Sequence, residues 1–231
     1  MQKIAVIIGA GSGISAAFAR ALAADGYQLA LAARQTTKLA ALAEETGAHL
    51  MAADAADVAS VAALFSELDH RFDALDVVLF NASYRTRGAI VDLDPVEVKR
   101  AIEVSAFAGF LVGQQAARRM LPRGQGAIFF TGASASVKGY AQSAPFAMGK
   151  FALRGLAQAM ARELQPQGIH VAHFVIDGGV KNAARGRAGD GAPADSLLDP
   201  TAIAQTYMAV LKQPRSAWSL EVELRPWLER F

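Results

Sequence analysis

The sequence predicts an α/β fold, in which a doubly wound parallel sheet of about seven strands forms the middle of three layers, with helices on both faces. Three observations predict it. Short apolar runs suited to buried strands alternate with longer segments of helical periodicity. The first apolar run, Lys3 to Ile8, stops at a glycine-rich turn, 9–13, that opens an alanine-rich segment. The chain has 231 residues, 53% of them apolar, which suits one domain over 1–231 with a large core.

Each predicted strand is a short apolar run, and each predicted helix is a longer periodic segment. The predicted strands are 3–8, 28–33, 49–53, 75–80, 127–131, 170–176 and 219–224. The predicted helices are 14–24, 57–72, two segments between 95 and 120, 145–164 and 200–212. Asp94 suits a helix cap and Pro95 a first helical turn. Residues 178–196 are rich in glycine, alanine and arginine, and we expect a substrate lid over 178–198.

The glycine turn after the first strand predicts a dinucleotide site. Glycines let such a turn tighten and let backbone amides approach a pyrophosphate, while the helix N-terminus adds a partial positive charge. The residues expected there are Gly9, Gly11, Ser12, Gly13 and Ile14. Because other strand–helix turns also carry glycines, the interpretation depends on the strand before the turn and the helix after it.

The end of the second strand indicates which dinucleotide is preferred. A carboxylate about 20 residues beyond the glycine turn accepts the ribose hydroxyls of NAD, whereas a 2′-phosphate needs cationic or hydroxyl donors. This chain has Arg34 there, followed by Thr36, Thr37 and Lys38, and no acid before Glu44. These residues favour NADP(H) over NAD(H). The alternative is that Arg34 is a solvated loop charge.

Composition excludes several other classes of function. The formal net charge is +2 and no run of basic residues occurs, so we expect no nucleic-acid partner. The absence of cysteine excludes disulfides, cysteine–zinc sites and a thiol nucleophile. His170 and His173 are an odd number of positions apart on a predicted strand and face opposite ways, so we expect no metal site. With no leader segment and no apolar run of about 18 residues, we expect a soluble, cytoplasmic protein that does not bind membranes.

Several motifs together resemble the short-chain dehydrogenase/reductase family, over nearly the whole chain, and the resemblance implies a Rossmann fold. The matching residues are Gly9 and Gly13, Asp54 after the third strand, Asn81-Ala82 after the fourth, Lys150 of the Tyr-x-x-x-Lys motif, and the segment 168–172. The resemblance implies that the cofactor also meets Ala55, and Gly178 and Val180 in the turn after the sixth strand. It further implies that Lys150 binds the nicotinamide ribose hydroxyls.

The departures from the family pattern fall mostly on its catalytic positions. Ser15 stands at the third glycine. The family's asparagine, serine and tyrosine fall on Ser105, Ala133 and Phe146, so three of its four catalytic positions lack their usual chemistry. Phe146 has no proton to give. Because proton transfer by a placed side chain is worth about 10² to 10⁴ in rate, its loss need not abolish turnover.

Other groups could supply the proton, and each has a structural alternative. Ser134 lies beside Ala133, and its alternative role is to bond its own backbone in a turn. Tyr140 and Tyr84 lie on loops at strand ends, and the alternative for each is a packing role. Lys150 lies in an apolar helix, where an ammonium is costly without partners, unless it snorkels to solvent. Lid cations at Lys181, Arg185 and Arg187 either meet an anionic substrate or are solvated.

Two classes of function therefore remain. One is an NADP(H)-dependent oxidoreductase that transfers hydride to or from a small carbonyl or hydroxyl compound. The other is a catalytically inactive dinucleotide-binding sensor or interaction protein. We favour the enzyme, because Lys150 and the lid would have little use in a scaffold. The helical segments 104–120 and 145–164 are apolar around much of their circumference, so we also expect a homodimer or homotetramer.

Overall fold

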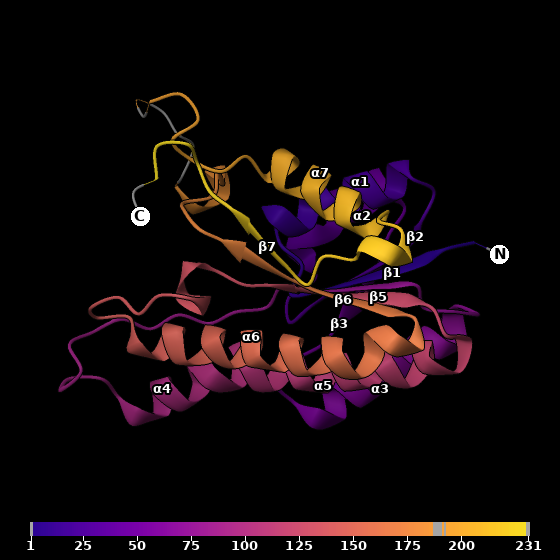
Figure 1. Ribbon diagram of the computed structural model, residues 1–231, viewed down its shortest axis with the longest axis horizontal. Coiled ribbons are helices and arrows are strands. Elements are labelled where there is room, and N and C mark those ends of the chain that lie inside the picture. Colours follow the sequence, from indigo (N-terminus) through magenta and orange to yellow (C-terminus); the bar gives the residue numbers. More distant parts are fainter. Residues whose placement is uncertain (1, 187–190, 192, 230–231) are drawn as a thin grey trace.

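Seven strands form one parallel sheet in the order β3-β2-β1-β4-β5-β6-β7 (Figure 1). The computed structural model describes residues 2–186, 191 and 193–229. The strands are β1 (Ile4–Ile8), β2 (Gln28–Ala33), β3 (His49–Ala52), β4 (Val77–Phe80), β5 (Gly126–Thr131), β6 (Ile169–Ile176) and β7 (Glu221–Leu224). The predicted fold class, a doubly wound parallel sheet with helices on both faces, is confirmed.

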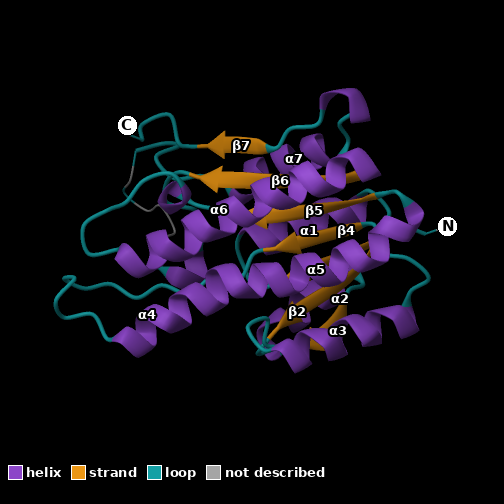
Figure 2. Ribbon diagram, turned by 60° about the horizontal axis from the view of Figure 1, so that its bottom comes forward, coloured by secondary structure: helices purple, strands orange, loops and turns teal. Residues whose placement is uncertain are grey.

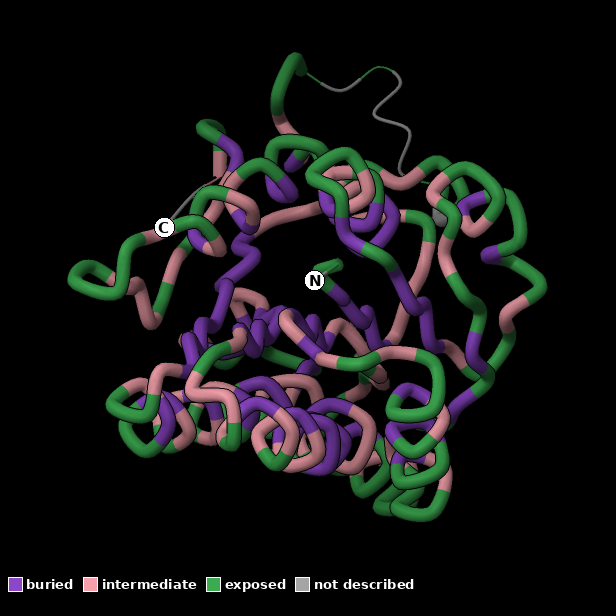
Figure 3. Tube along the Cα trace, turned by 90° about the vertical axis from the view of Figure 1, so that its right-hand side faces the viewer, coloured by how far each residue is buried: buried purple, intermediate pink, exposed green. Residues whose placement is uncertain are grey.

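Helices cover both faces of the sheet (Figures 1 and 2). One face carries α1 (Ile14–Ala24), α2 (Ala40–Thr46) and α7 (Pro200–Leu211), and the other carries α3 (Val58–Arg71), α4 (Pro95–Ile102), α5 (Ala108–Met120) and α6 (Ala144–Leu164). Since both faces are covered, the central strands are buried throughout, and Figure 3 shows these buried residues between the outer layers. This is why these strands are continuous apolar runs in the sequence.

The two cores take alternate residues from each strand. From β1, Val6 and Ile8 belong to the core under α3, α5 and α6, whereas Ala5 and Ile7 belong to the core under α1 and α7. Val6 is in register with Val78 of β4, so the central strands present matching layers to each helix face. Alternation of this kind follows from the two-residue repeat of a strand.

The helix α2 is absent from the elements that the sequence predicts. It has only seven residues, and its short apolar contact, with Leu39 before it and Leu42 within it buried, gives little periodicity. Gly47, with φ +67°, ends it in the left-handed conformation that glycine adopts freely. Among the described residues, no helix has the length and hydropathy needed to cross a membrane.

The predicted break between the two segments of 95–120 takes the form of a π-helical stretch. Residues Glu103–Phe107 join α4 to α5 with this wider winding. Next to it, outward-facing Phe107, Phe110, Met148 and Phe151 are between 42% and 50% exposed on α5, α6 and the π-helical stretch. Phe107 and Phe110 stack with their ring centroids 6.2 Å apart. An apolar surface therefore runs along these helices.

Candidate active site

The loops that follow the strands bring the predicted site residues to the carboxyl edge of the sheet. The chain passes from β1 outward to β2 and β3, then returns to the other side of β1 to form β4. The crevice at such a reversal, outside the carboxyl ends of the strands, is where open α/β sheets bind ligands. The glycine turn follows β1, and Asn81 follows β4, so they border this crevice directly.

The glycine turn is held tightly against the loop after β4. Gly9 has φ +76°, and a Cβ there would lie 2.4 Å from the backbone nitrogen of Ala82, so only glycine fits. The buried hydroxyl of Ser15 accepts a hydrogen bond from Asn81 Nδ2 at 2.7 Å. Ser15 occupies the position of the third glycine in the family pattern, and its hydroxyl connects this turn to Asn81.

The start of α1 leaves its backbone amides available. Gly13 is the residue at the N-cap, no side chain caps the helix, and no acidic residue occupies its first turn. A Cβ on Gly11 would meet no atom within 4 Å, so space lies above the turn. Ser12 Oγ donates to Asn182 Oδ1 at 3.2 Å, which brings the loop after β6 over the turn. The arrangement suits an anionic group.

The residues predicted to meet the adenosine end lie on neighbouring loops. Arg34 is exposed directly after β2. Asp54 follows β3, and its Oδ1 accepts a hydrogen bond from the backbone of Ala56 at 3.0 Å. The backbone amide of Asp54 in turn donates to Ser60 Oγ at 2.9 Å, which holds this loop against α3.

Lys150 is a buried ammonium close to the same edge. It lies on α6 with 3% of its surface exposed, and its Nζ donates to the carbonyl oxygen of Thr131, at the end of β5, at 2.7 Å. It does not snorkel to solvent. Burial lowers the pKa of Lys150 to about 8, because the charged form is poorly solvated there. The group can therefore take up or release a proton near neutral pH.

Phe146 lies close to two cations. The guanidinium carbon of Arg85 is 4.7 Å from the centroid of its ring, and Lys150 Nζ is 5.9 Å from the same centroid. A cation over an aromatic face is attracted by the ring quadrupole. Arg85 comes from the loop after β4, so this contact joins that loop to α6.

The loop after β5 carries the predicted serine position and its neighbours. Ala133 and Ser134 are half-buried, and Ser134 opens a short 3₁₀ turn, 134–136. The fully buried Ser136 Oγ accepts a hydrogen bond from the backbone of Ala133 at 3.1 Å. Ser105, also fully buried, lies in the π-helical stretch. It packs closely against Gly149 of α6, where an added Cβ would lie 2.8 Å from the Cβ of Ser105. Stretches of this winding often occur at functional sites.

The two candidate tyrosines differ in their surroundings. The hydroxyl of Tyr84 donates to the carboxylate of Glu97 on α4, which raises the pKa of this phenol. The hydroxyl proton of Tyr84 is therefore engaged in the hydrogen bond to Glu97. Tyr140 is 47% exposed on the loop before α6. Neither phenol is hydrogen-bonded to Lys150, whose Nζ donates to the carbonyl oxygen of Thr131.

The loop after β6 is anchored by ion pairs. Asp177 is buried at the end of β6, where Lys138 Nζ and Arg225 Nη2 each lie 3.0 Å from its Oδ2. Gly178 follows with φ +149°, and Val180 bridges to Leu198. Part of the expected lid lies outside the described residues, namely 187–190, which include Arg187, and 192. The side chain of Arg185 is also not described. Lys181 is exposed.

Sequence reasoning misses four residues that the fold brings to this edge, namely Arg85, Ser136, His173 and Asn182. Arg85, Ser136 and Asn182 are polar residues in polar loops, so nothing in the sequence distinguishes them. His173 does carry a signal, since it interrupts the buried strand β6, and it lies on the opposite face from His170, as their spacing predicts. No group of three or more His, Asp or Glu within the described ranges could hold a metal ion.

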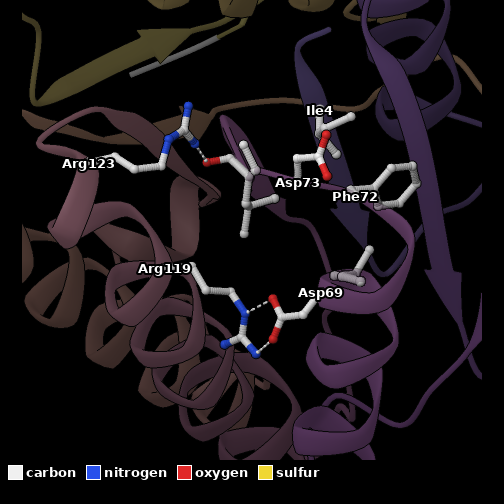
Figure 4. Close-up of a pocket in the computed structure, with 9 residues that line it drawn as sticks. Ile4, Asp69, Phe72, Asp73, Arg119 and Arg123 are labelled. Atoms are coloured by element: carbon white, nitrogen blue, oxygen red, sulfur yellow. Dashed lines mark hydrogen bonds and ion pairs between the residues drawn. The ribbon is translucent and has the colours of Figure 1, made fainter. Parts of the chain in front are cut away.

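Two hollows lie at the other, amino-terminal edge of the sheet. A cavity of about 130 Å³ is lined by Ile4, Asp69, Phe72, Asp73, Arg119 and Arg123 among others (Figure 4). Its arginines are already paired, Arg119 with Asp69 at 2.5 Å and Arg123 with Asp76 at 2.8 Å. A more open hollow of about 440 Å³ is lined by Lys3, Tyr27 and Gly126 among others. Neither contains a predicted site residue.

The sequence and the structure of the chain are both similar to those of known dehydrogenases. The family model described as short chain dehydrogenase matches residues 3–189. A trans-4-hydroxycyclohexanecarboxylate dehydrogenase from Sinomonas cyclohexanicum is 33% identical over 195 residues, which cover 78% of this chain and 73% of the relative. A short-chain dehydrogenase structure from Rhodopseudomonas palustris is 36% identical, with a TM-score of 0.83 and coverage of 97% of this chain and 99% of that chain. An alcohol dehydrogenase structure from the archaeon Thermococcus sibiricus, complexed with 5-hydroxy-NADP, is 28% identical, with a TM-score of 0.87 and coverage of 100% and 99%.

Proposed function

The chain belongs to the short-chain dehydrogenase family, and we propose that it is an NADP(H)-dependent oxidoreductase acting on a small carbonyl or hydroxyl compound. The observation that carries this proposal is Lys150, a buried ammonium at the carboxyl edge of the sheet beside Phe146. An ammonium in this position is costly unless a ligand or a reaction uses it. The Thermococcus sibiricus relative, complexed with 5-hydroxy-NADP, supports the choice of dinucleotide.

The residues around the crevice fit a dinucleotide. The space above Gly11 and the uncapped start of α1 suit its pyrophosphate, while Gly9 allows the turn to lie close to β4. The proposed contacts are Gly9, Gly11, Ser12, Gly13, Ile14, Arg34, Asp54, Ala55, Asn81, Lys150, Gly178 and Val180. When bound, the cofactor supplies or accepts the hydride. We further propose that 178–198 closes over it, which the contact between Ser12 and Asn182 supports.

In this proposal Phe146, Ala133 and Ser105 occupy the family's tyrosine, serine and asparagine positions. Lys150 then takes over the proton transfer to the substrate oxygen, either directly or through water. Its pKa of about 8 is close to the operating pH, which is where a general acid is most effective. Tyr84 is engaged with Glu97, and Ser134 and Tyr140 are the remaining candidates.

The proposed function is tested by mixing the protein with NADPH and a panel of aldehydes, ketones and quinones, and following nicotinamide absorbance. Oxidation of NADPH that depends on both protein and carbonyl supports the oxidoreductase. The second class, a dinucleotide-binding sensor or interaction protein, would instead be indicated by two results together. NADPH would bind tightly, and the protein would neither oxidise NADPH with any carbonyl nor reduce NADP with any alcohol.

The first prediction concerns cofactor choice. We expect NADPH to bind at least several-fold more tightly than NADH, because Arg34 can pair with the 2′-phosphate and no acid stands at the end of β2. The variant Arg34→Asp should narrow or reverse this ratio. Calorimetric titration of both nucleotides measures it, with the exposed Lys99→Asp on α4 as a control for the change of net charge. Equal affinities in the wild type would contradict the NADP assignment.

The second prediction concerns assembly. We propose that the apolar surface formed by Phe107, Phe110, Met148 and Phe151 is covered by the same surface of a second subunit, giving a two-fold homodimer or a homotetramer. Light scattering at micromolar concentration should therefore give at least twice the chain mass of 24.3 kDa. The double variant Phe110→Glu/Phe151→Glu should shift the protein to monomers. A wild type that is monomeric would refute the assignment.

A further inference from the structure

We propose that His173 and Glu221 form a proton relay that connects the buried Lys150 to solvent. This inference rests on the proposed function, in which Lys150 gives its proton to the substrate oxygen. Lys150 has only 3% of its surface exposed and so has little contact with bulk water, yet each turnover requires its proton to be replaced. The surroundings of His173 provide a route.

His173 lies against the backbone of the loop after β5, at Gly132. It is fully buried on β6, and a Cβ on Gly132 would be only 2.3 Å from its Nε2 and 2.8 Å from Ser136 Oγ. Gly132 is therefore required to make room for the imidazole. Gly132 directly follows Thr131, whose carbonyl oxygen accepts the hydrogen bond from Lys150. The Nε2 side of the ring thus faces Gly132, the residue next to the one that accepts the hydrogen bond from Lys150.

Neither ring nitrogen of His173 has a hydrogen-bond partner in the described part of the chain. Nδ1 lies 3.5 Å from Glu221 Oε2, which is too long for a normal hydrogen bond. Two unpartnered polar atoms in a fully buried ring are destabilising, and an apolar side chain would avoid this cost. The imidazole therefore calls for a role that an apolar residue could not fill.

The charged groups around His173 define the two ends of the route. The charged groups that act on His173 are Lys150 and Arg154 of α6 and Glu221 of β7, and Arg154 is itself paired with Glu221. Ser136 Oγ lies near the Nε2 side of the ring, since both atoms are close to the position of a Cβ on Gly132. Burial, reinforced by the two cations, lowers the pKa of His173 to about 4, so the ring is neutral at pH 7. A neutral imidazole has one protonated and one free nitrogen, and can accept a proton on one while releasing another.

Glu221 is the outer end of the route. Its side chain is 30% exposed, and Arg154 holds both carboxylate oxygens, at 2.6 Å and 2.8 Å. The ion pair with Arg154 lowers the pKa of Glu221, which keeps it a carboxylate. A carboxylate beside Nδ1 stabilises the imidazolium that forms when a proton arrives from solvent. The proton on Nε2 then passes to the neutral amine of Lys150, which becomes an ammonium again. His173 is left neutral with its proton on Nδ1, and its return to the Nε2–H tautomer completes the cycle.

The test measures steady-state reduction of 9,10-phenanthrenequinone by NADPH. The ratio kcat/KM reports the steps up to the first proton transfer, whereas kcat also includes the reloading of Lys150 that follows it. In His173→Asn and Glu221→Gln we therefore expect kcat to fall about tenfold while kcat/KM changes less than about twofold. Added imidazole should restore kcat in His173→Ala, and thiophene, which has no titrating nitrogen, should not. Matched controls are His170→Asn on the same strand and Glu45→Gln, whose carboxylate also pairs with an arginine. An equal fall in kcat and kcat/KM, without rescue, would mean that His173 is only structural.

A second measurement needs no turnover. Exchange of the Lys150 ammonium protons with water, followed by ¹H–¹⁵N NMR of lysine-labelled protein and assigned with Lys150→Arg, should slow in His173→Asn and Glu221→Gln. Unchanged exchange would refute the relay. If the wild type oxidises no NADPH with the quinone, the proposed function fails, and this exchange measurement alone then decides whether the relay exists.

Discussion

The double variant Phe146→Tyr/Ala133→Ser is expected to reduce carbonyl compounds about 100-fold faster than the wild type, the order of gain attributed to a placed acid catalyst. The new phenol would lie beside the ammonium of Lys150, which is 5.9 Å from the present ring, and this charge would lower the pKa of the tyrosine. The serine would add a second hydrogen-bond donor to the substrate oxygen. Initial rates of NADPH oxidation over the carbonyl panel measure the gain.

The control for this variant is Phe72→Tyr, which adds a phenol at the amino-terminal edge of the sheet, away from the crevice. It should leave the rate unchanged. If the double variant binds NADPH normally but gains no activity on any carbonyl tested, then the pocket is arranged for other chemistry or for none. In that case the stacking of Arg85 on Phe146 would be the first contact to examine.

The variant Lys150→Met is expected to lower carbonyl reduction at least about 100-fold, because it removes the proposed general acid. It should also weaken NADPH binding in the wild-type and Phe146→Tyr/Ala133→Ser backgrounds, since the ribose would lose a cationic donor. We expect no large loss of stability, because the buried ammonium is itself costly, although the carbonyl of Thr131 loses its partner. Steady-state rates, calorimetry and thermal unfolding measure the three effects, with the exposed Lys99→Met as control.

The pH dependence of the wild type provides an independent check on Lys150. Its pKa is lowered to about 8, so the ammonium form that can donate a proton prevails below that pH. Carbonyl reduction should therefore decline as the pH rises through about 8, and alcohol oxidation, which needs the neutral amine, should increase over the same range. A rate of reduction that is independent of pH in this range would show that Lys150 is not the acid.

The fold and the position of the glycine turn could be predicted because their signals are local. Strands covered on both faces are apolar runs, and the tight approach of Gly9 to Ala82 requires a glycine at that position. Lys150 is recognisable because a cation within an apolar helix is rare without a purpose. The helix α2 could not be predicted, because it is short and contributes only a small apolar contact to the core.

The sequence by itself determined the parallel sheet, the position of the glycine turn and the presence of a cation beside Phe146, since each depends on residues that are near one another in the chain. Only the tertiary structure decided that Arg85 stacks on Phe146, that Asn182 reaches Ser12, and that His173 lies against Gly132 with Glu221 on its other side. These contacts join separate loops and strands, and their geometry follows from the order of the strands and the packing of α6. No local pattern of residues encodes such a meeting, because it depends on where the whole chain places each loop.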